Sequence, residues 1–123
     1  MAEDDRSLVR LYHYILEDIG GHTIKSASNG REVIKTYKNL NLKPDLLILD
    51  HRMPLLSGID TMKEVLKLNN KTKIIFTSAD SYIGNQALQL GARAFLSKPF
   101  DIKDLLQTVN NVLNLCKEEQ QII

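Results

Sequence analysis

The feature that most constrains the fold is a short, uninterrupted apolar run, Leu46–Leu49, flanked by Asp45 and Asp50. A run of this length and composition is typical of a strand that is buried on both faces, as in a parallel sheet. Two further apolar runs, 74–77 and 94–97, follow it, and segments with helical spacing separate the three. Strands that alternate with helices predict an α/β fold, a doubly wound parallel sheet with helices on both faces.

Apolar residues recur at three- and four-residue spacing in the segments between these runs, which predicts helices. The predicted helices cover residues 8–19, 33–40, 59–66, 82–90 and 102–113. A short strand is predicted over 22–26, and Asn29-Gly30 predicts a turn before the second helix. Gly91 is expected to end the fourth helix, and Asp101 to cap the N-terminus of the last one.

The overall composition excludes several classes of protein. The chain has 123 residues, the length of one domain, and a net charge of +1, so no basic excess for nucleic-acid binding is present. Its acidic start, Met1–Asp5, differs from a signal peptide, and no apolar run is long enough to cross a membrane. The single cysteine, Cys116, cannot form an internal disulfide. We therefore expect one cytoplasmic domain over 1–123.

Polar residues follow the predicted strands at their carboxyl ends, where ligands bind in sheets of this kind. They are Glu3, Asp4, Asp50, Thr77, Ser78 and Lys98. Taken singly, each of these residues has a plain structural explanation, such as a helix start, a turn or a surface lysine. In a parallel sheet, however, all of them would lie at the same edge. Neighbouring carboxylates repel, and Mg²⁺ relieves that repulsion, while a lysine balances a phosphoryl group. The pattern predicts phosphoryl transfer to or from a carboxylate.

These residues and their surroundings resemble the receiver domains of response regulators in two-component signalling, over essentially the whole chain. The matching segments are Glu3-Asp4, Leu46–Asp50, Met53-Pro54, Gly58, Ser78-Ala79 and Lys98-Pro99-Phe100. The resemblance implies a five-stranded flavodoxin-like sheet of order 2-1-3-4-5. It also implies that Asp50 is the phospho-acceptor, which takes a phosphoryl group from a histidine kinase or a phosphotransfer protein.

The same resemblance assigns roles around Asp50. Mg²⁺ would be held by Asp4, Asp50 and the backbone carbonyl of Arg52, with Glu3 acting partly through water. Lys98 would contact the phosphate and precede a cis-proline. His51, beside the acceptor, is expected to be a solvated loop residue.

The resemblance further implies a hydroxyl and an aromatic ring that act as a switch. Ser78 is favoured as the hydroxyl over its neighbour Thr77, because an alanine follows it. Phe95, three residues before Lys98, is the aromatic residue that turns inward when the hydroxyl moves to the phosphoryl group. An ordinary core role is the alternative for Phe95, since buried phenylalanine is common.

Two departures from the family pattern affect the expected fold. Only Met1 and Ala2 precede Glu3 where the family has a longer apolar strand, so the first strand is predicted to be truncated. Such a truncation predicts one of three arrangements: a natural chain that starts upstream, a strand at 22–26 that pairs directly with 46–49, or two chains that associate through the exposed edge. We expect a four-stranded core that can self-associate. The segment from Ser78 to Gly91 is also shorter than usual, which predicts a short or loosely formed fourth helix.

The sequence as a whole predicts a stand-alone receiver that signals through a downstream protein. It would catalyse only its own phosphorylation and dephosphorylation, and is not expected to be a turnover enzyme. The alternative is a degenerate receiver, an interaction module that is never phosphorylated. An aspartyl phosphatase would need an acid–base aspartate where Arg52 stands, and a flavin protein would need a phosphate loop where Glu3-Asp4-Asp5 stands.

Overall fold

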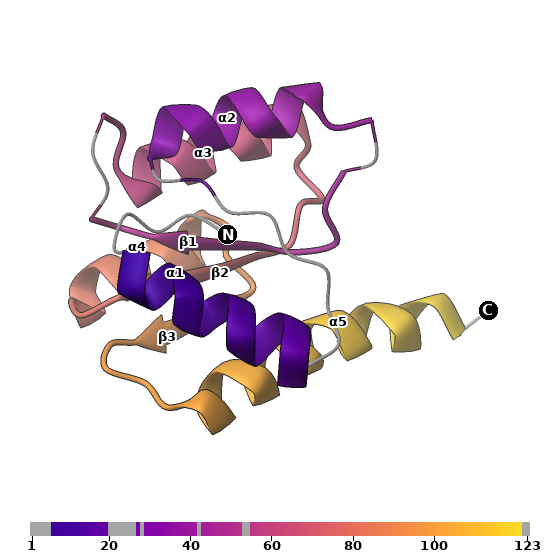
Figure 1. Cartoon of the computed structure of the whole chain (residues 1–123). Coiled ribbons are helices and arrows are strands. Elements are labelled where there is room, and N and C mark those ends of the chain that lie inside the picture. Colours follow the sequence, from indigo (N-terminus) through magenta and orange to yellow (C-terminus); the bar gives the residue numbers. More distant parts are fainter. Residues whose placement is uncertain (1–5, 20–26, 28, 42, 53–54, 122–123) are drawn as a thin grey trace.

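A computed structural model of the chain describes residues 6–19, 27, 29–41, 43–52 and 55–121 (Figure 1). In chain order its elements are α1 (Arg6–His13), the π-helical η1 (Tyr14–Ile19), α2 (Gly30–Asn39), β1 (Leu47–Asp50), α3 (Gly58–Leu68), β2 (Ile74–Ser78), α4 (Ser81–Leu90), β3 (Ala94–Ser97) and α5 (Ile102–Gln121). Helices and strands therefore alternate as the apolar pattern predicts.

The strands form one parallel sheet of order β1-β2-β3 within the described residues. Asp50 of β1 lies beside Thr77 of β2, and Thr77 lies beside Leu96 of β3. These strands are the predicted third, fourth and fifth strands in their predicted order, which confirms the doubly wound fold class. The predicted strand at 22–26 and the truncated strand before Glu3 lie outside the described residues.

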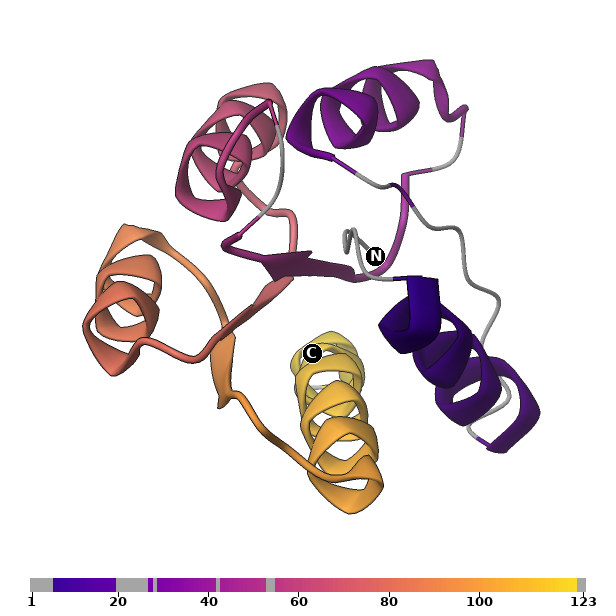
Figure 2. The same ribbon diagram turned by 60° about the vertical axis from the view of Figure 1, so that its left-hand side comes forward.

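Two apolar clusters lie on opposite faces of the sheet, and helices cover both (Figure 2). The first cluster joins Leu49 and Phe76 to α2, α3 and α4. The second joins Ile48 and Ile75 to α1, η1 and α5. The side chains of a strand alternate between its two faces. The cluster to which a strand residue belongs therefore shows which face the residues after it point to.

Helix ends follow the capping chemistry of the sequence, with one adjustment. Asn29, expected in a turn, caps α2 by accepting a hydrogen bond from the Glu32 amide (2.8 Å), so α2 begins earlier than predicted. Asp101 caps α5 as expected and accepts a hydrogen bond from the Asp104 amide (2.8 Å). No helix in the described part of the chain is both long and apolar enough to cross a membrane.

The fourth helix differs from the expectation of a short or loosely formed element. α4 is a regular helix of 10 residues, capped by Asp80, whose Oδ1 accepts a hydrogen bond from the Tyr82 amide at 2.9 Å. Gly91 ends it with φ 122°, in the region that favours glycine. The two caps stabilise both ends, so the shorter segment still forms a regular helix.

Candidate functional site

An ion pair between a buried carboxylate and a half-buried lysine lies at the carboxyl edge of the sheet. Asp50 is the last residue of β1 and only 6% exposed, while Lys98 follows β3 directly. The Lys98 Nζ atom lies 2.9 Å from Asp50 Oδ1. A buried carboxylate is costly without a partner, and the lysine supplies the opposite charge and a hydrogen-bond donor. The structure thus brings together two of the residues that the sequence assigns to phosphoryl transfer.

Strand alternation explains why these two side chains meet. Ile48 and Leu96 belong to the cluster under α1 and α5, and Asp50 and Lys98 each stand two residues further along the chain. Thr77 of β2, which lies between β1 and β3, stands two residues after Ile75 and so points to the same face of the sheet. Its hydroxyl lies 3.3 Å from Asp50 Oδ1. The side chains of Asp50, Thr77 and Lys98 therefore lie together on one face of the sheet, at its carboxyl edge.

Ser78 lies at the same edge, but its side chain points to the other face of the sheet, the face of Phe76 two residues before it. Its Oγ accepts a hydrogen bond from the amide of Asp80 at 3.0 Å. Both hydroxyls are buried, at 1% for Thr77 and 5% for Ser78. The strand register thus separates two candidates that the sequence leaves adjacent: Thr77 contacts the carboxylate of Asp50, and Ser78 contacts the start of α4.

Backbone contacts hold the loops around Asp50 close to the sheet. The His51 amide donates to the Thr77 carbonyl (3.2 Å), and the Gly58 amide donates to the His51 carbonyl (2.9 Å). A Cβ at Gly58 would lie 2.4 Å from the Asp50 carbonyl oxygen, so only glycine permits this approach of α3. The peptide bond between Lys98 and Pro99 is cis, as the resemblance implies.

Phe95 connects β3, the strand that Lys98 follows, to helix α4. It pairs with Phe76 across the β2–β3 ladder and packs, partly buried, against the first apolar cluster. A Cβ at Gly84 would lie 2.3 Å from two carbons of the Phe95 ring and 2.4 Å from a third. The ring therefore rests directly on the helix backbone at Gly84, in a space that any other side chain would fill.

Two of the predicted metal ligands fall within the described residues. Asp50 offers a carboxylate and Arg52 a backbone carbonyl, and both are the hard oxygen donors that Mg²⁺ prefers. Glu3 and Asp4 lie outside the described residues, and the described part of the chain holds no cluster of three acidic, histidine or cysteine side chains. The donor chemistry of Asp50 and the Arg52 carbonyl fits a hard divalent cation.

His51 differs from the solvated loop residue that the sequence suggests. Its ring lies 6.0 Å from the ring of Phe76, and its Nδ1 is buried without a hydrogen-bond partner among the described residues. The Gly58 and Thr77 contacts hold the His51 backbone against the sheet and the start of α3. This half-burial is a consequence of the tight loop after β1.

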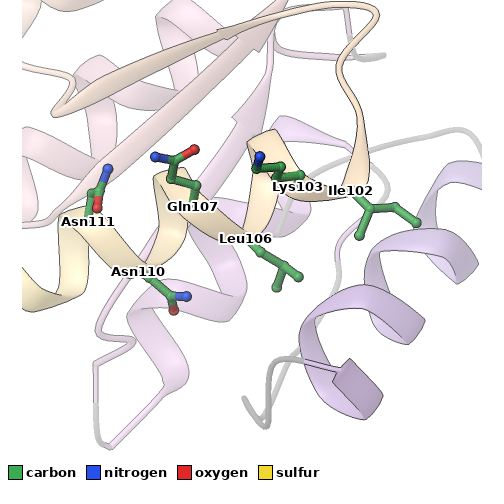
Figure 3. Close-up of a pocket in the computed structure, with 6 residues that line it drawn as sticks. All are labelled: Ile102, Lys103, Leu106, Gln107, Asn110 and Asn111. Carbon is green, nitrogen blue, oxygen red and sulfur yellow. The ribbon is translucent and has the colours of Figure 1, made fainter.

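A separate hollow on the surface is formed by consecutive turns of α5 (Figure 3). It is lined by Ile102, Lys103, Leu106, Gln107, Asn110 and Asn111. Lys103 is the only charged residue among them, and neither Asp50 nor Lys98 borders it. The hollow therefore has no part in the chemistry at the sheet edge.

Comparisons with known proteins agree on one family. The model of the response regulator receiver domain family matches residues 1–110. The chemotaxis protein CheY of Thermotoga maritima is 36% identical over 118 residues, which cover 89% of this chain and 92% of that protein. CheY of Bacillus subtilis is 32% identical over 120 residues, covering 90% and 93%.

Solved structures give the same result. A response regulator receiver domain protein from Clostridium thermocellum superposes with a TM-score of 0.85 at 27% identity, covering 94% of this chain and 93% of that one. CheY in the CheX–CheY–BeF3–Mg2+ complex from Borrelia burgdorferi superposes with a TM-score of 0.83 at 28% identity, covering 90% and 84%. Both resemblances extend over most of each chain.

Proposed function

This chain belongs to the response regulator receiver domain family, and from that premise we propose that Asp50 is the acceptor of a phosphoryl group from a histidine kinase or a phosphotransfer protein. Members of this family are signalling switches rather than turnover enzymes. The observation that carries the proposal is the buried Asp50 carboxylate at the end of β1, with Lys98 Nζ 2.9 Å from its Oδ1. We place this exchange in the cytoplasm.

In the proposed reaction, a carboxylate oxygen of Asp50 attacks the phosphorus atom of a phosphohistidine on the partner protein. The P–N bond breaks, its electron pair stays on the imidazole, and an acyl phosphate forms on Asp50. Lys98 balances negative charge as the phosphoryl group arrives, because its ammonium already lies against the carboxylate. Burial of Asp50 limits the access of water to the acyl phosphate.

Binding of Mg²⁺ is characteristic of the family, and the CheY complex with BeF3 and Mg2+ is one example by name. When bound, the ion neutralises charge shared by the acceptor and the phosphoryl oxygens. We propose that Asp4, Asp50 and the backbone carbonyl of Arg52 hold it, with Glu3 acting partly through water.

The signal, in this proposal, leaves the site through α4 and β3. Ser78 moves its hydroxyl to the phosphoryl group, and this motion disturbs its hydrogen bond with the Asp80 amide at the start of α4 (3.0 Å). Phe95 packs between β3 and α4 and responds to the same change. A local charge change thereby biases a packing element, and a downstream protein binds the altered surface.

Labelling with a small phosphodonor tests the proposal. The full chain, incubated with acetyl phosphate and Mg²⁺, should gain the mass of one phosphoryl group, and Asp50→Asn should abolish the gain because the amide is not a nucleophile. Asp45→Asn is the matched control, since Asp45 is exposed and stands two residues before the opposite end of β1. That variant should label like the unaltered protein.

Two results would contradict the proposal. Labelling that survives in Asp50→Asn would place the acceptor elsewhere. A folded protein that neither labels nor binds beryllofluoride would favour the degenerate receiver, an interaction module that needs no phosphorylation.

A further inference from the structure

The hydroxyl of Thr77 is shared between two acceptors at nearly equal distances. Its Oγ1 lies 3.3 Å from Asp50 Oδ1 and 3.4 Å from the carbonyl oxygen of Leu49. A threonine hydroxyl carries one proton, so it can donate fully to only one of the two. At 1% exposure water does not compete for that proton. The charge on Oδ1 therefore decides where the Thr77 proton points.

Phosphorylation would change that charge. Within the described residues, the contacts of the Asp50 carboxylate, from Lys98 and Thr77, both go to Oδ1, which leaves Oδ2 to attack phosphorus. In the acyl phosphate, Oδ1 is a neutral carbonyl oxygen and a weaker acceptor than a carboxylate oxygen. The Thr77 proton can then turn to the Leu49 carbonyl, which lies within reach on the neighbouring strand.

We propose that Thr77 shortens the lifetime of phosphorylated Asp50 by donating a hydrogen bond to the carboxylate as it leaves. This inference rests on the proposed function of Asp50 and concerns the return step. A water oxygen attacks phosphorus, the P–Oδ2 bond breaks, and its electron pair goes to the carboxylate. Both protons of the water remain on the phosphate, which is released as H₂PO₄⁻. Negative charge returns to Oδ1 in this step, where the Thr77 hydroxyl stabilises it.

The size of the effect follows from the difference between two hydrogen bonds. A hydrogen bond to a charged acceptor is stronger than one to a neutral carbonyl, and the 3.3 Å separation places this one at the weak end of its class. Part of this difference in hydrogen-bond strength is already present in the transition state for hydrolysis, where negative charge is returning to the carboxylate. We expect removal of the hydroxyl to slow hydrolysis about fivefold, which corresponds to about 1 kcal/mol.

The test compares hydrolysis rates after the full chain has been labelled with acetyl phosphate and the donor removed. Thr77→Val keeps the branched shape without the hydroxyl and should lengthen the lifetime of phosphorylated Asp50 about fivefold. Thr77→Ala is a second hydroxyl-free variant and should do the same. Thr77→Ser restores the donor and should restore a rate near that of the unaltered protein.

The outcomes separate this inference from the function on which it rests. Hydrolysis at the unaltered rate in both hydroxyl-free variants would overturn the role of Thr77 and leave Asp50 as the acceptor. A lifetime that follows side-chain volume, long in Thr77→Ser and Thr77→Ala but not in Thr77→Val, would show packing instead and also overturn it. Absence of labelling in the unaltered protein would overturn both proposals.

Discussion

Substitution of Gly84 by alanine should destabilise the protein, although alanine is the better helix former. Gly84 lies inside α4, where glycine costs about 1 kcal/mol relative to alanine. Propensity alone would thus make Gly84→Ala stabilising by that amount. The Phe95 ring occupies the space of the new methyl group, however, with ring carbons 2.3 Å from the position of the added Cβ.

The size of the destabilisation follows from how far the added methyl group and the Phe95 ring must move apart. Non-bonded carbons are in favourable contact at about 3.5–4.0 Å, so either α4 withdraws from β3 or the ring leaves its place by more than about 1 Å. Overpacking of this kind costs about 1–3 kcal/mol, against the helix gain of about 1 kcal/mol. The net change expected for Gly84→Ala is a loss of about 0–2 kcal/mol in the free energy of unfolding.

A double-mutant cycle isolates the contact. In a Phe95→Ala background the ring is absent, so Gly84→Ala should instead stabilise by about 1 kcal/mol, with a coupling of about 1–3 kcal/mol between the two positions. Urea unfolding followed by circular dichroism measures all four proteins. Asn85→Ala, exposed on the same helix, is the control for propensity and should stabilise slightly in both backgrounds. Equal stabilisation by Gly84→Ala with and without Phe95 would refute the packing argument.

Two further predictions concern the metal site and the opposite end of the sheet. Mg²⁺ in excess should raise the melting temperature by binding the folded state, and Asp4→Ala should remove that shift; a shift that persists would make the acidic pair a helix-start cluster only. Tyr37→Phe should lower the free energy of unfolding by about 1 kcal/mol, because the buried Tyr37 hydroxyl bonds Thr72 Oγ1 at 2.7 Å. Tyr82→Phe, at a site 76% exposed, should change nothing.

The fold could be predicted from the sequence because its strongest signals are periodic and short-range. The run Leu46–Leu49 is apolar at every position because both faces of β1 are covered, by α3 on one side and by the α5 cluster on the other. Asp101 fell where a cap was expected because its side chain meets an amide only three residues away. Asn29 carries a weaker signal, since the same side chain suits a turn and a helix cap.

The meeting of Asp50 and Lys98 at one sheet edge could be predicted from the sequence, whereas the detailed contacts around them could not. Asp50 and Lys98 each follow an apolar run, and parallel strands bring such positions to one edge whatever the exact register. The half-burial of His51 and the fit of Phe95 on Gly84 depend instead on how closely helices approach the sheet, which no local pattern encodes. Glycines at 58 and 84 were the available signal, because a missing side chain marks where backbone and neighbour meet.

The choice between Thr77 and Ser78 depends on a single residue of strand register. Side chains alternate across a strand, so a hydroxyl at 77 shares its face with Ile75 and one at 78 shares its face with Phe76. Both neighbours are fully buried and apolar, so hydropathy gives no sign of which face continues to Asp50. The structure shows that Thr77 is the hydroxyl that contacts Asp50: the two α-carbons are direct partners in the ladder, and their side chains project to the same side. The two adjacent hydroxyls therefore have different partners on opposite faces of the strand: Thr77 contacts the Asp50 carboxylate, and Ser78 contacts the backbone at the start of α4.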